Sequence, residues 1–298
     1  MRWNAALGGL AASWGFVAVL AASVELGAEA LAFWRLALAT VTLALIAAAA
    51  CRLDLLSPRG RIGPLALLGV VQAAHWLLFF EAVEHGSVAL AVLTFYAAPL
   101  VIALAGPLLL PERLSALVLG ACVAGAVGIA AISLDSDTSG GIAAVAAGLG
   151  SAATYAVLVI VSKRLLVGET PPLTLAFWDC LFGTIAVAPV LLVADRVLPT
   201  GMGEWAAVLT LGVVFTALST LVYATLLRRV TAQAAGVLTF LEPVAGVLLG
   251  WAILEQRPGA ATLTGGALVL AAGLAVVVFE PGTARVAEAP PGVGSPQP

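Results

Sequence analysis

Ten long apolar segments make up most of this chain, and they constrain its fold more than any other feature. Each runs for about 20 residues, is rich in Ala and Leu, and lacks the alternation of apolar and polar residues that marks a half-buried strand. Backbone groups in lipid must be satisfied internally, which a helix achieves within itself. The segments therefore predict ten transmembrane helices, at residues 5–23, 29–50, 63–83, 87–110, 114–134, 141–162, 171–194, 205–227, 231–254 and 260–279.

The composition of the chain supports a membrane location. Hydrophobic residues make up 62% of it and charged residues only 10%, and the mean hydropathy is +1.13. Soluble domains carry about 25% charged residues, so this chain could not cover a water-facing surface with polar groups. The composition excludes an ordinary soluble enzyme, a nucleic-acid-binding module and a disordered protein. It predicts an all-α integral membrane protein whose surroundings are a lipid bilayer.

Arginine and lysine are distributed unequally between the two sets of connections. One set holds ten of the 13 basic residues: Arg2, Arg52, Arg59, Arg61, Arg113, Lys163, Arg164, Arg228, Arg229 and Arg285. The opposite set holds Arg196 and Arg257, with Arg35 at a membrane edge. Short cytoplasmic loops carry the excess of basic residues, so both termini are predicted in the cytoplasm. A cleaved signal peptide over residues 1–23 is the competing interpretation, but its removal would leave nine helices.

The end of the chain differs from the rest. Residues 280–298 are rich in Pro, Gly and Ala and have no apolar period. Such a composition cannot bury enough apolar surface to fold, so we expect a disordered cytoplasmic tail.

The sequence repeats itself after 144 or 145 residues. Leu-Ala-Phe-Trp at 31–34 recurs at 175–178, and Val-Leu-Thr-Phe at 92–95 recurs at 237–240. Further matches at nearly the same offset are Pro99 with Pro243, Gly120 with Gly265, Gly128 with Gly273 and Glu112 with Glu255. Tetrapeptides that contain aromatic residues do not readily recur at one offset by chance, which indicates an internal duplication.

Each repeat, residues 1–134 and residues 141–279, contains five predicted helices. Because five is odd, the two repeats enter the membrane from opposite sides. Inverted repeats of this kind are the architecture of secondary transporters, whose substrate site lies near the bilayer midplane between the halves. They predict a carrier that works by alternating access. Some channels also have inverted repeats, so a channel-like facilitator stays open as an alternative.

The residues that carry the repeat also carry a resemblance to a known family. The motifs are Ser13-Trp14-Gly15, Phe33-Trp34-Arg35, the stretch from Pro99 to Glu112-Arg113, Gly120 with Gly128, Pro243 and Glu255. Their order over residues 5–279 resembles the EamA-type pattern of the drug/metabolite transporter superfamily. The resemblance implies a ten-helix carrier of the bacterial inner (plasma) membrane that exports amino acids or other small metabolites. One departure is that Asp179 stands in the second repeat where Arg35 stands in the first, so a role for the arginine cannot be copied across.

Glu242 is the clearest polar residue inside a predicted helix. It lies eleven residues beyond Thr231, or about 16 Å along a helix, which places it close to the midplane. A charge there costs roughly 2.5–3.5 kcal/mol and needs an explanation. Pro243 follows it directly and predicts a kink. We interpret Glu242 as a cavity carboxylate that holds an ammonium group or exchanges a proton; a neutral, hydrogen-bonded structural carboxyl is the alternative.

A second polar face lies on the predicted helix 63–83. Gln72, His75 and Phe79 follow the spacing i, i+3 and i+7, which places them on one face, and Trp76 lies about 100° round. A polar stripe flanked by aromatic rings suits an amphipathic solute, although a lone histidine also serves as a packing residue. The complete set of predicted substrate-binding residues is Trp14, Gln72, His75, Trp76, Phe79, Tyr96, Pro99, Tyr155, Thr239 and Glu242.

Other conspicuous residues are assigned to structure. Arg35 and Asp179 lie near opposite ends of their predicted helices, where we expect them to anchor at the interface by snorkelling. The GxxxG at 246–250 permits close helix packing within the chain or in a weak dimer, so a monomer and a weak dimer both stay open. The three cysteines are far apart and are expected to be small core residues, without a disulfide or a metal site.

Together these features predict a secondary transporter and not an enzyme, with no cofactor and no nucleic-acid partner. Its expected substrates are small metabolites, first of all amino acids with apolar or aromatic side chains, and protons are a candidate coupling ion. Export of other amphipathic metabolites or drugs is the alternative. The sequence contains no HExxH motif, no nucleotide-binding GxxxxGK[ST] and no charged ring or carbonyl filter of the kind that channels use.

Overall fold

A computed structural model describes residues 2–21, 23–134, 141–192, 194–254 and 259–280. Its α-helices are α1 (Arg2–Ser13), α2 (Gly15–Ala21), α3 (Ala28–Ala49), α4 (Ile62–Glu84), α5 (Val88–Phe95), α6 (Ala98–Leu109), α7 (Ala116–Ser133), α8 (Ile142–Val167), α9 (Pro172–Val187), α10 (Gly201–Gly212), α11 (Ser219–Leu227), α12 (Ala232–Leu238), α13 (Leu241–Leu254) and α14 (Ala260–Phe279). Two 3-10 helices, η1 (Leu53–Leu56) and η2 (Ala188–Leu192), and one π-helical segment, η3 (Val213–Leu218), complete the described elements.

The helices confirm the predicted fold class. They form ten apolar segments long enough to cross a membrane, in the order and nearly at the positions that the sequence indicates. The first begins at Arg2 rather than at residue 5, the sixth continues to Val167 rather than ending at 162, and the eighth begins at Gly201 rather than at 205. These differences lie at helix ends, where the apolar pattern gives way to polar residues that a helix also accepts. The predicted tail beyond Glu280 lies outside the described residues.

Three of the ten segments are broken in the middle. The breaks fall at Trp14, at Tyr96–Ala97 and at Thr239–Phe240. Proline has no backbone N–H, and its ring clashes with the carbonyl four residues earlier. Pro99 and Pro243 therefore interrupt the fourth and ninth segments one turn ahead of themselves, at equivalent places in the two repeats. The sequence predicts the break near Pro243, and the structure adds the other two.

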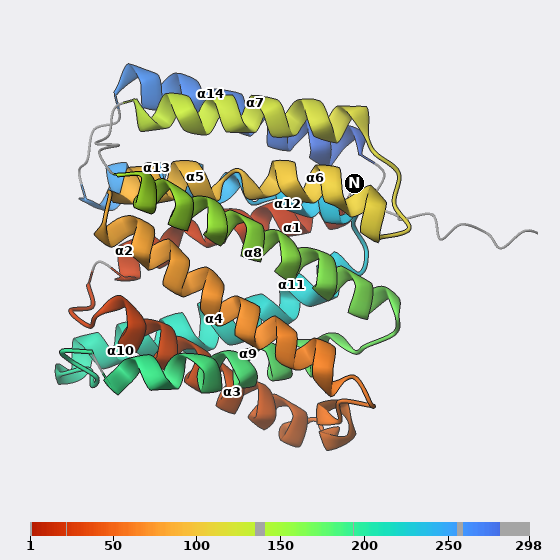
Figure 1. The fold of residues 1–298 in the computed structure, drawn as a ribbon, viewed down its shortest axis with the longest axis vertical. Coiled ribbons are helices and arrows are strands. Elements are labelled where there is room, and N and C mark those ends of the chain that lie inside the picture. Colours follow the sequence, from red (N-terminus) through yellow and green to blue (C-terminus); the bar gives the residue numbers. More distant parts are fainter. Residues whose placement is uncertain (1, 22, 135–140, 193, 255–258, 281–298) are drawn as a thin grey trace, which may run out of the picture.

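The two repeats pack through equivalent helices. In Figure 1, α7 and α14, the last helices of the repeats, lie side by side along one edge of the molecule, and α3, α9 and α10 lie along the opposite edge. Gly128 and Gly265 let α7 and α14 approach closely, because a Cβ on either would lie only 2.7 or 2.4 Å from the carbonyl oxygen of the other. The N-terminal helix and the end of α14 meet at one end of the bundle, where Asn4 donates to the carbonyl of Val276.

A buried ion pair ties the helices together at that same end. Lys163 Nζ donates to the carbonyl oxygens of Leu227 (2.8 Å) and Val230 (2.5 Å) and lies 3.9 Å from Glu112 Oε1. Both charged side chains are 1% exposed. Glu112 also accepts from the backbone N–H of Ala232 with both oxygens, at 3.0 Å. Burial raises the pKa of the Glu112 carboxyl, and the backbone N–H of Ala232 and the charge of Lys163 counteract this rise.

Candidate functional site

A cavity of about 710 Å³ opens between the two repeats. Its walls come from α2, α3, α4 and α5 of the first repeat, with Trp14 at the break before α2, and from α8, α9, η3, α11 and α13 of the second. All of the predicted binding residues except Pro99 line it: Trp14, Gln72, His75, Trp76, Phe79, Tyr96, Tyr155, Thr239 and Glu242. Helix breaks thus coincide with the cavity, because Trp14, Tyr96 and Thr239 each stand at one.

Pro99 does not lie in the cavity wall, contrary to the sequence-based expectation. It is buried against α12, where a Cβ on Gly236 would lie 3.3 Å from the Pro99 Cα. Its carbonyl oxygen accepts from the thiol of Cys122 at 3.5 Å. Pro99 affects the cavity only indirectly, because it causes the helix break that leaves Tyr96 at the end of α5.

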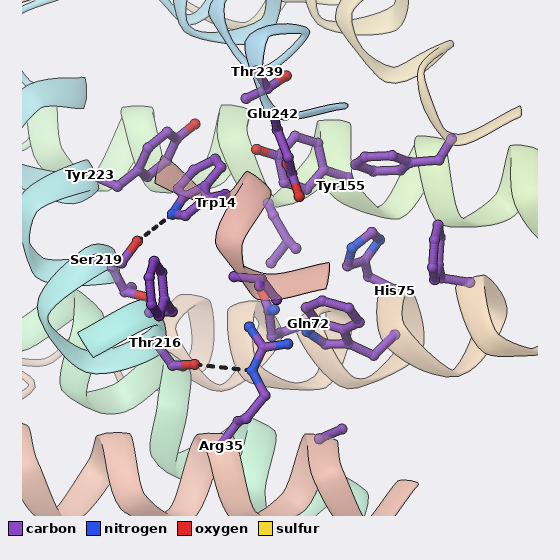
Figure 2. Close-up of a pocket in the computed structure, with 18 of the residues that line it drawn as sticks. Trp14, Arg35, Gln72, His75, Tyr155, Thr216, Ser219, Tyr223, Thr239 and Glu242 are labelled. Carbon is purple, nitrogen blue, oxygen red and sulfur yellow. Dashed lines mark hydrogen bonds between the residues drawn. The ribbon is translucent and has the colours of Figure 1, made fainter. Parts of the chain in front are cut away.

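Glu242 projects into the cavity from the first turn of α13, directly beyond the break at Thr239–Phe240 (Figure 2). The Tyr96 hydroxyl approaches its carboxyl group closely enough for the two to interact. Phe240 stacks on the Tyr96 ring, with centroids 5.5 Å apart and planes 26° apart. The two broken segments, equivalent in the repeats, therefore present a carboxyl and a phenol to the same space.

His75 is fixed within an aromatic cluster on the α4 and α8 side. Its ring centroid lies 5.3 Å from those of Trp76 and Phe95 and 5.5 Å from that of Tyr155. Its Nδ1 lies 3.1 Å from the carbonyl oxygen of Ser151 and 2.9 Å from the Ser151 hydroxyl. Since Nδ1 is engaged there, Nε2 is the ring nitrogen that remains for another partner.

Further rings extend this cluster along α4. Phe79 packs edge-on against Trp76, Phe80 and Phe95, with centroid distances of 6.4, 6.1 and 6.0 Å. Gln72 lies on the same helix, half-buried in the cavity wall, as the i, i+3, i+7 pattern predicts. The polar face and its aromatic flanks therefore do line one cavity.

A second aromatic group lies on the opposite wall. Trp14 donates from Nε1 to the Ser219 hydroxyl at 2.5 Å, and its ring lies 5.8 Å from that of Tyr223 (Figure 2). The Tyr223 hydroxyl is buried in this wall, near the hydroxyl of Tyr155. Ser219 and Tyr223 belong to α11, so this wall joins the first and eighth membrane segments.

Arg35 and Asp179 line the cavity as well, and the sequence reasoning missed this. It expected both to snorkel to the membrane surface. Arg35 instead donates from Nε to the Thr216 hydroxyl at 3.2 Å, and its guanidinium lies 5.0 Å from the Trp76 ring centroid. Asp179 has a buried oxygen, Oδ1, with no hydrogen-bond partner among the described residues.

Two signals could have revealed this placement. Arg35 lies seven residues into α3, about 10 Å along its axis, which is deep for an interface anchor. Asp179 occupies the equivalent position in the repeat, so the duplication that places Tyr96 and Glu242 in one cavity also relates these two residues. No sequence signal pointed to the π-helical segment η3, which carries Thr216 and bonds its hydroxyl back to Leu211 at 2.9 Å.

The cavity therefore combines a guanidinium, two carboxyl groups and several aromatic rings. Charged groups that face a cavity inside a membrane bundle mark substrate or ion pathways. Among the described residues, the group with metal-ligand geometry is Glu81, Glu84 and His85, which is exposed and lies outside the cavity wall. The arrangement suits reversible binding of a small amphipathic solute.

Comparison with known proteins places the chain among transporters. A model of the EamA-like transporter family matches it twice, over residues 1–134 and 142–279. An uncharacterized transporter of Archaeoglobus fulgidus is 28% identical over 223 residues, which cover 74% of this chain and 77% of that one. The uncharacterized transporter YojE of Bacillus subtilis is 30% identical over 208 residues, which cover 67% of this chain and 65% of YojE. A crystal structure of a protein 22% identical has the same fold, with a TM-score of 0.79 over 90% of this chain and 95% of that one.

Proposed function

Because the chain belongs to the EamA-like transporter family, we propose that it is a secondary transporter that exports small metabolites across the inner membrane by alternating access. One observation carries the proposal: charged and aromatic side chains from both inverted repeats line a single cavity. In transporters of this architecture, one repeat rocks against the other around a central site. We assign Glu242 and His75 to binding in this site and not to catalysis.

The substrates we propose are amino acids with apolar or aromatic side chains. The Glu242 carboxylate suits an ammonium group, and Trp14, Trp76 and Tyr155 contribute aromatic rings to the wall that an apolar side chain would contact. A volume of about 710 Å³ falls within the usual range of small-molecule sites, roughly 300–1,000 Å³. Other amphipathic metabolites or drugs would use the same walls and are the competing substrates.

Uptake by the purified protein in proteoliposomes tests this substrate class. We expect saturable uptake of labelled phenylalanine, inhibited by unlabelled tryptophan, tyrosine and leucine and not by glutamate or lysine. Empty liposomes give the background. If folded protein takes up no member of a broad amino-acid panel, the substrate proposal is wrong, and sugars, nucleosides and cationic drugs become the next probes. Flux that rises linearly with concentration would favour a channel-like facilitator.

Proton exchange at Glu242 is the coupling we propose. Its half-buried side chain lines the cavity beside Tyr96 and near Arg35, where gain or loss of a proton changes the charge that a substrate meets. We expect Glu242→Gln to abolish the acceleration of flux by a pH gradient. Glu84→Gln, on the exposed end of α4, is the matched control and keeps it. Unchanged pH-driven flux in Glu242→Gln would exclude Glu242 as the proton site.

A further inference from the structure

Arg35 is the positively charged side chain in the wall of a cavity that also contains two acidic ones. Figure 2 shows its guanidinium reaching into the cavity from α3, with Glu242 approaching from the opposite wall. The two charges are near enough to attract one another, yet no direct salt bridge between them is recorded in the described part of the chain. The site therefore keeps a cation and an anion apart across the space that a solute would occupy.

Only part of the Arg35 guanidinium is used within the protein. Nε donates to Thr216, and the Trp76 ring lies against the planar group. These contacts fix its orientation, while the two terminal nitrogens have no recorded hydrogen bond to the described residues. An arginine presents its terminal N–H groups as a fork that matches a carboxylate with two parallel hydrogen bonds. The free edge of Arg35 is therefore preorganised for an anionic group.

We infer that Arg35 binds the carboxylate of the substrate while Glu242 receives its ammonium group, so that the transporter selects zwitterions and rejects amines without a carboxylate. The inference rests on the proposed function and names a residue for its substrate selectivity. A zwitterion adds no net charge to the cavity and compensates both groups at once. An amine without a carboxylate would satisfy Glu242, leave Arg35 uncompensated and be repelled by it.

A purely structural role for Arg35 is the competing explanation. In that case its bond to Thr216 would serve to hold α3 against η3, and the chemistry of the substrate's acid group would be irrelevant. The two explanations predict different results when the solute loses its carboxylate and the protein is unchanged. The test therefore begins with substrate analogues on the unchanged transporter.

The experiment measures competition against labelled phenylalanine uptake in proteoliposomes. The competitors are unlabelled phenylalanine, phenylalaninamide, which lacks the negative charge, and phenethylamine, which lacks the carboxylate altogether. With the wild-type protein we expect both analogues to compete about 10- to 100-fold more weakly than phenylalanine, because they forfeit a charge-assisted pair of hydrogen bonds. Equal competition by all three compounds would overturn the inference and leave amino-acid transport standing.

Arg35→Gln then assigns the selectivity to this side chain. We expect the KM for phenylalanine to rise by a similar factor and the discrimination against phenethylamine to disappear. Arg35→Lys keeps the positive charge but not the forked pair of N–H donors, and it should restore part of the discrimination against phenethylamine. Arg164→Gln, an exposed residue at the end of α8, is the matched control and keeps the wild-type order. If Arg35→Gln weakens all three compounds equally, Arg35 has only a structural role.

The outcomes separate this inference from the proposal on which it rests. Saturable phenylalanine uptake without a preference for the carboxylate contradicts the inference alone. Saturable uptake of phenethylamine in the absence of any amino-acid uptake contradicts both. Wild-type protein that takes up neither compound contradicts the proposed amino-acid function and the inference with it. The wild-type comparison distinguishes these outcomes even where an Arg35 variant fails to fold.

Discussion

His75 shows how a single side chain is prepared in the cavity wall. Ser151 engages Nδ1 through its carbonyl oxygen and its hydroxyl, and three aromatic rings hold the imidazole plane. If Nδ1 carries the proton that the Ser151 carbonyl accepts, Nε2 offers a lone pair to a donor in the cavity. In that tautomer, we propose that the residue is a fixed hydrogen-bond acceptor among aromatic rings.

Replacing His75 by phenylalanine separates these two contributions. His75→Phe keeps an aromatic ring in the cluster and removes the acceptor, so we expect the KM for phenylalanine to rise about five- to tenfold with little change in the maximal rate. Proteoliposome uptake measures both parameters. His85→Phe is the control, because His85 is exposed and contacts Glu81 instead of the cavity. An unchanged KM in His75→Phe would assign His75 to packing alone.

At the residue scale, a polar residue inside an apolar helix is a sound guide to the cavity, whereas closeness to a helix end is misleading for Arg35. Glu242, His75 and Gln72 could be predicted because a polar group in the middle of a membrane helix is costly and needs a purpose. Arg35 was missed because a long arginine side chain near a helix end can reach the surface, and the sequence does not tell in which direction it extends. Only the packing of α3 against η3, which gives Nε its partner, settles that direction.

At the scale of helices, the broken segments and close glycine contacts shape the cavity. Gly15 begins α2 directly after the break at Trp14, and a Cβ there would lie 2.6 Å from the backbone nitrogen of Gly246 on α13. This close approach requires glycine at position 15 and not at position 246, because a Cβ on Gly246 would meet nothing within 4 Å. The sequence contained the glycines, but the break at Trp14 and the π-helical segment depend on tertiary contacts that no local pattern records.

Gly15→Ala is predicted to disturb this packing. An added methyl group at 2.6 Å from backbone atoms forces α2 and α13 apart, so we expect the unfolding temperature to fall and uptake to decrease. Gly9→Ala on α1 is the control, because its Cβ would meet nothing within 4 Å and alanine favours the helix. A thermal unfolding assay in detergent compares the two. Equal unfolding temperatures for the variants would show that the α2–α13 contact yields easily.

Lys163 provides a second prediction about the connections between helices. The sequence predicts Lys163 on a connection between helices, whereas the structure buries it against Glu112 near the end of α8. Removing one partner of a buried pair leaves the other charge uncompensated, at a typical cost of about 3–5 kcal/mol. Lys163→Met should therefore lower the unfolding temperature markedly, and Arg164→Met, at the exposed neighbouring position, should not. A Lys163→Met protein as stable as the wild type would show that the ion pair makes no net contribution to the stability of the fold.

For the molecule as a whole, the ten segments and the duplication were predictable because each follows from long-range regularities in the sequence. Apolar length fixes the number of spans, and the recurring tetrapeptides fix which helices correspond. The volume and the charge pattern of the cavity were not predictable, since both depend on how the two repeats pack. Orientation in the membrane stays a prediction from the distribution of arginine and lysine.

Cys51 offers a direct test of that orientation. It is exposed just beyond α3, on a connection predicted to be cytoplasmic, while Cys122 and Cys180 are buried. A membrane-impermeant maleimide should label Cys51 in inside-out vesicles and leave it unlabelled in intact bacterial cells. Cys51→Ser identifies the labelled site, because it should remove the signal. Labelling of Cys51 from outside intact cells would reverse the predicted topology.

The central claim, that two inverted repeats form an alternating-access carrier around one cavity, is tested most directly by counterflow. Proteoliposomes loaded with unlabelled phenylalanine are diluted into a trace of labelled phenylalanine. A carrier exchanges one molecule for another, so we predict that the label accumulates transiently above its equilibrium level. Vesicles loaded with unlabelled leucine or tryptophan in place of phenylalanine should show the same overshoot. Equilibration of the label without such an overshoot, at the same rate whatever is loaded inside, would contradict the account and indicate a channel.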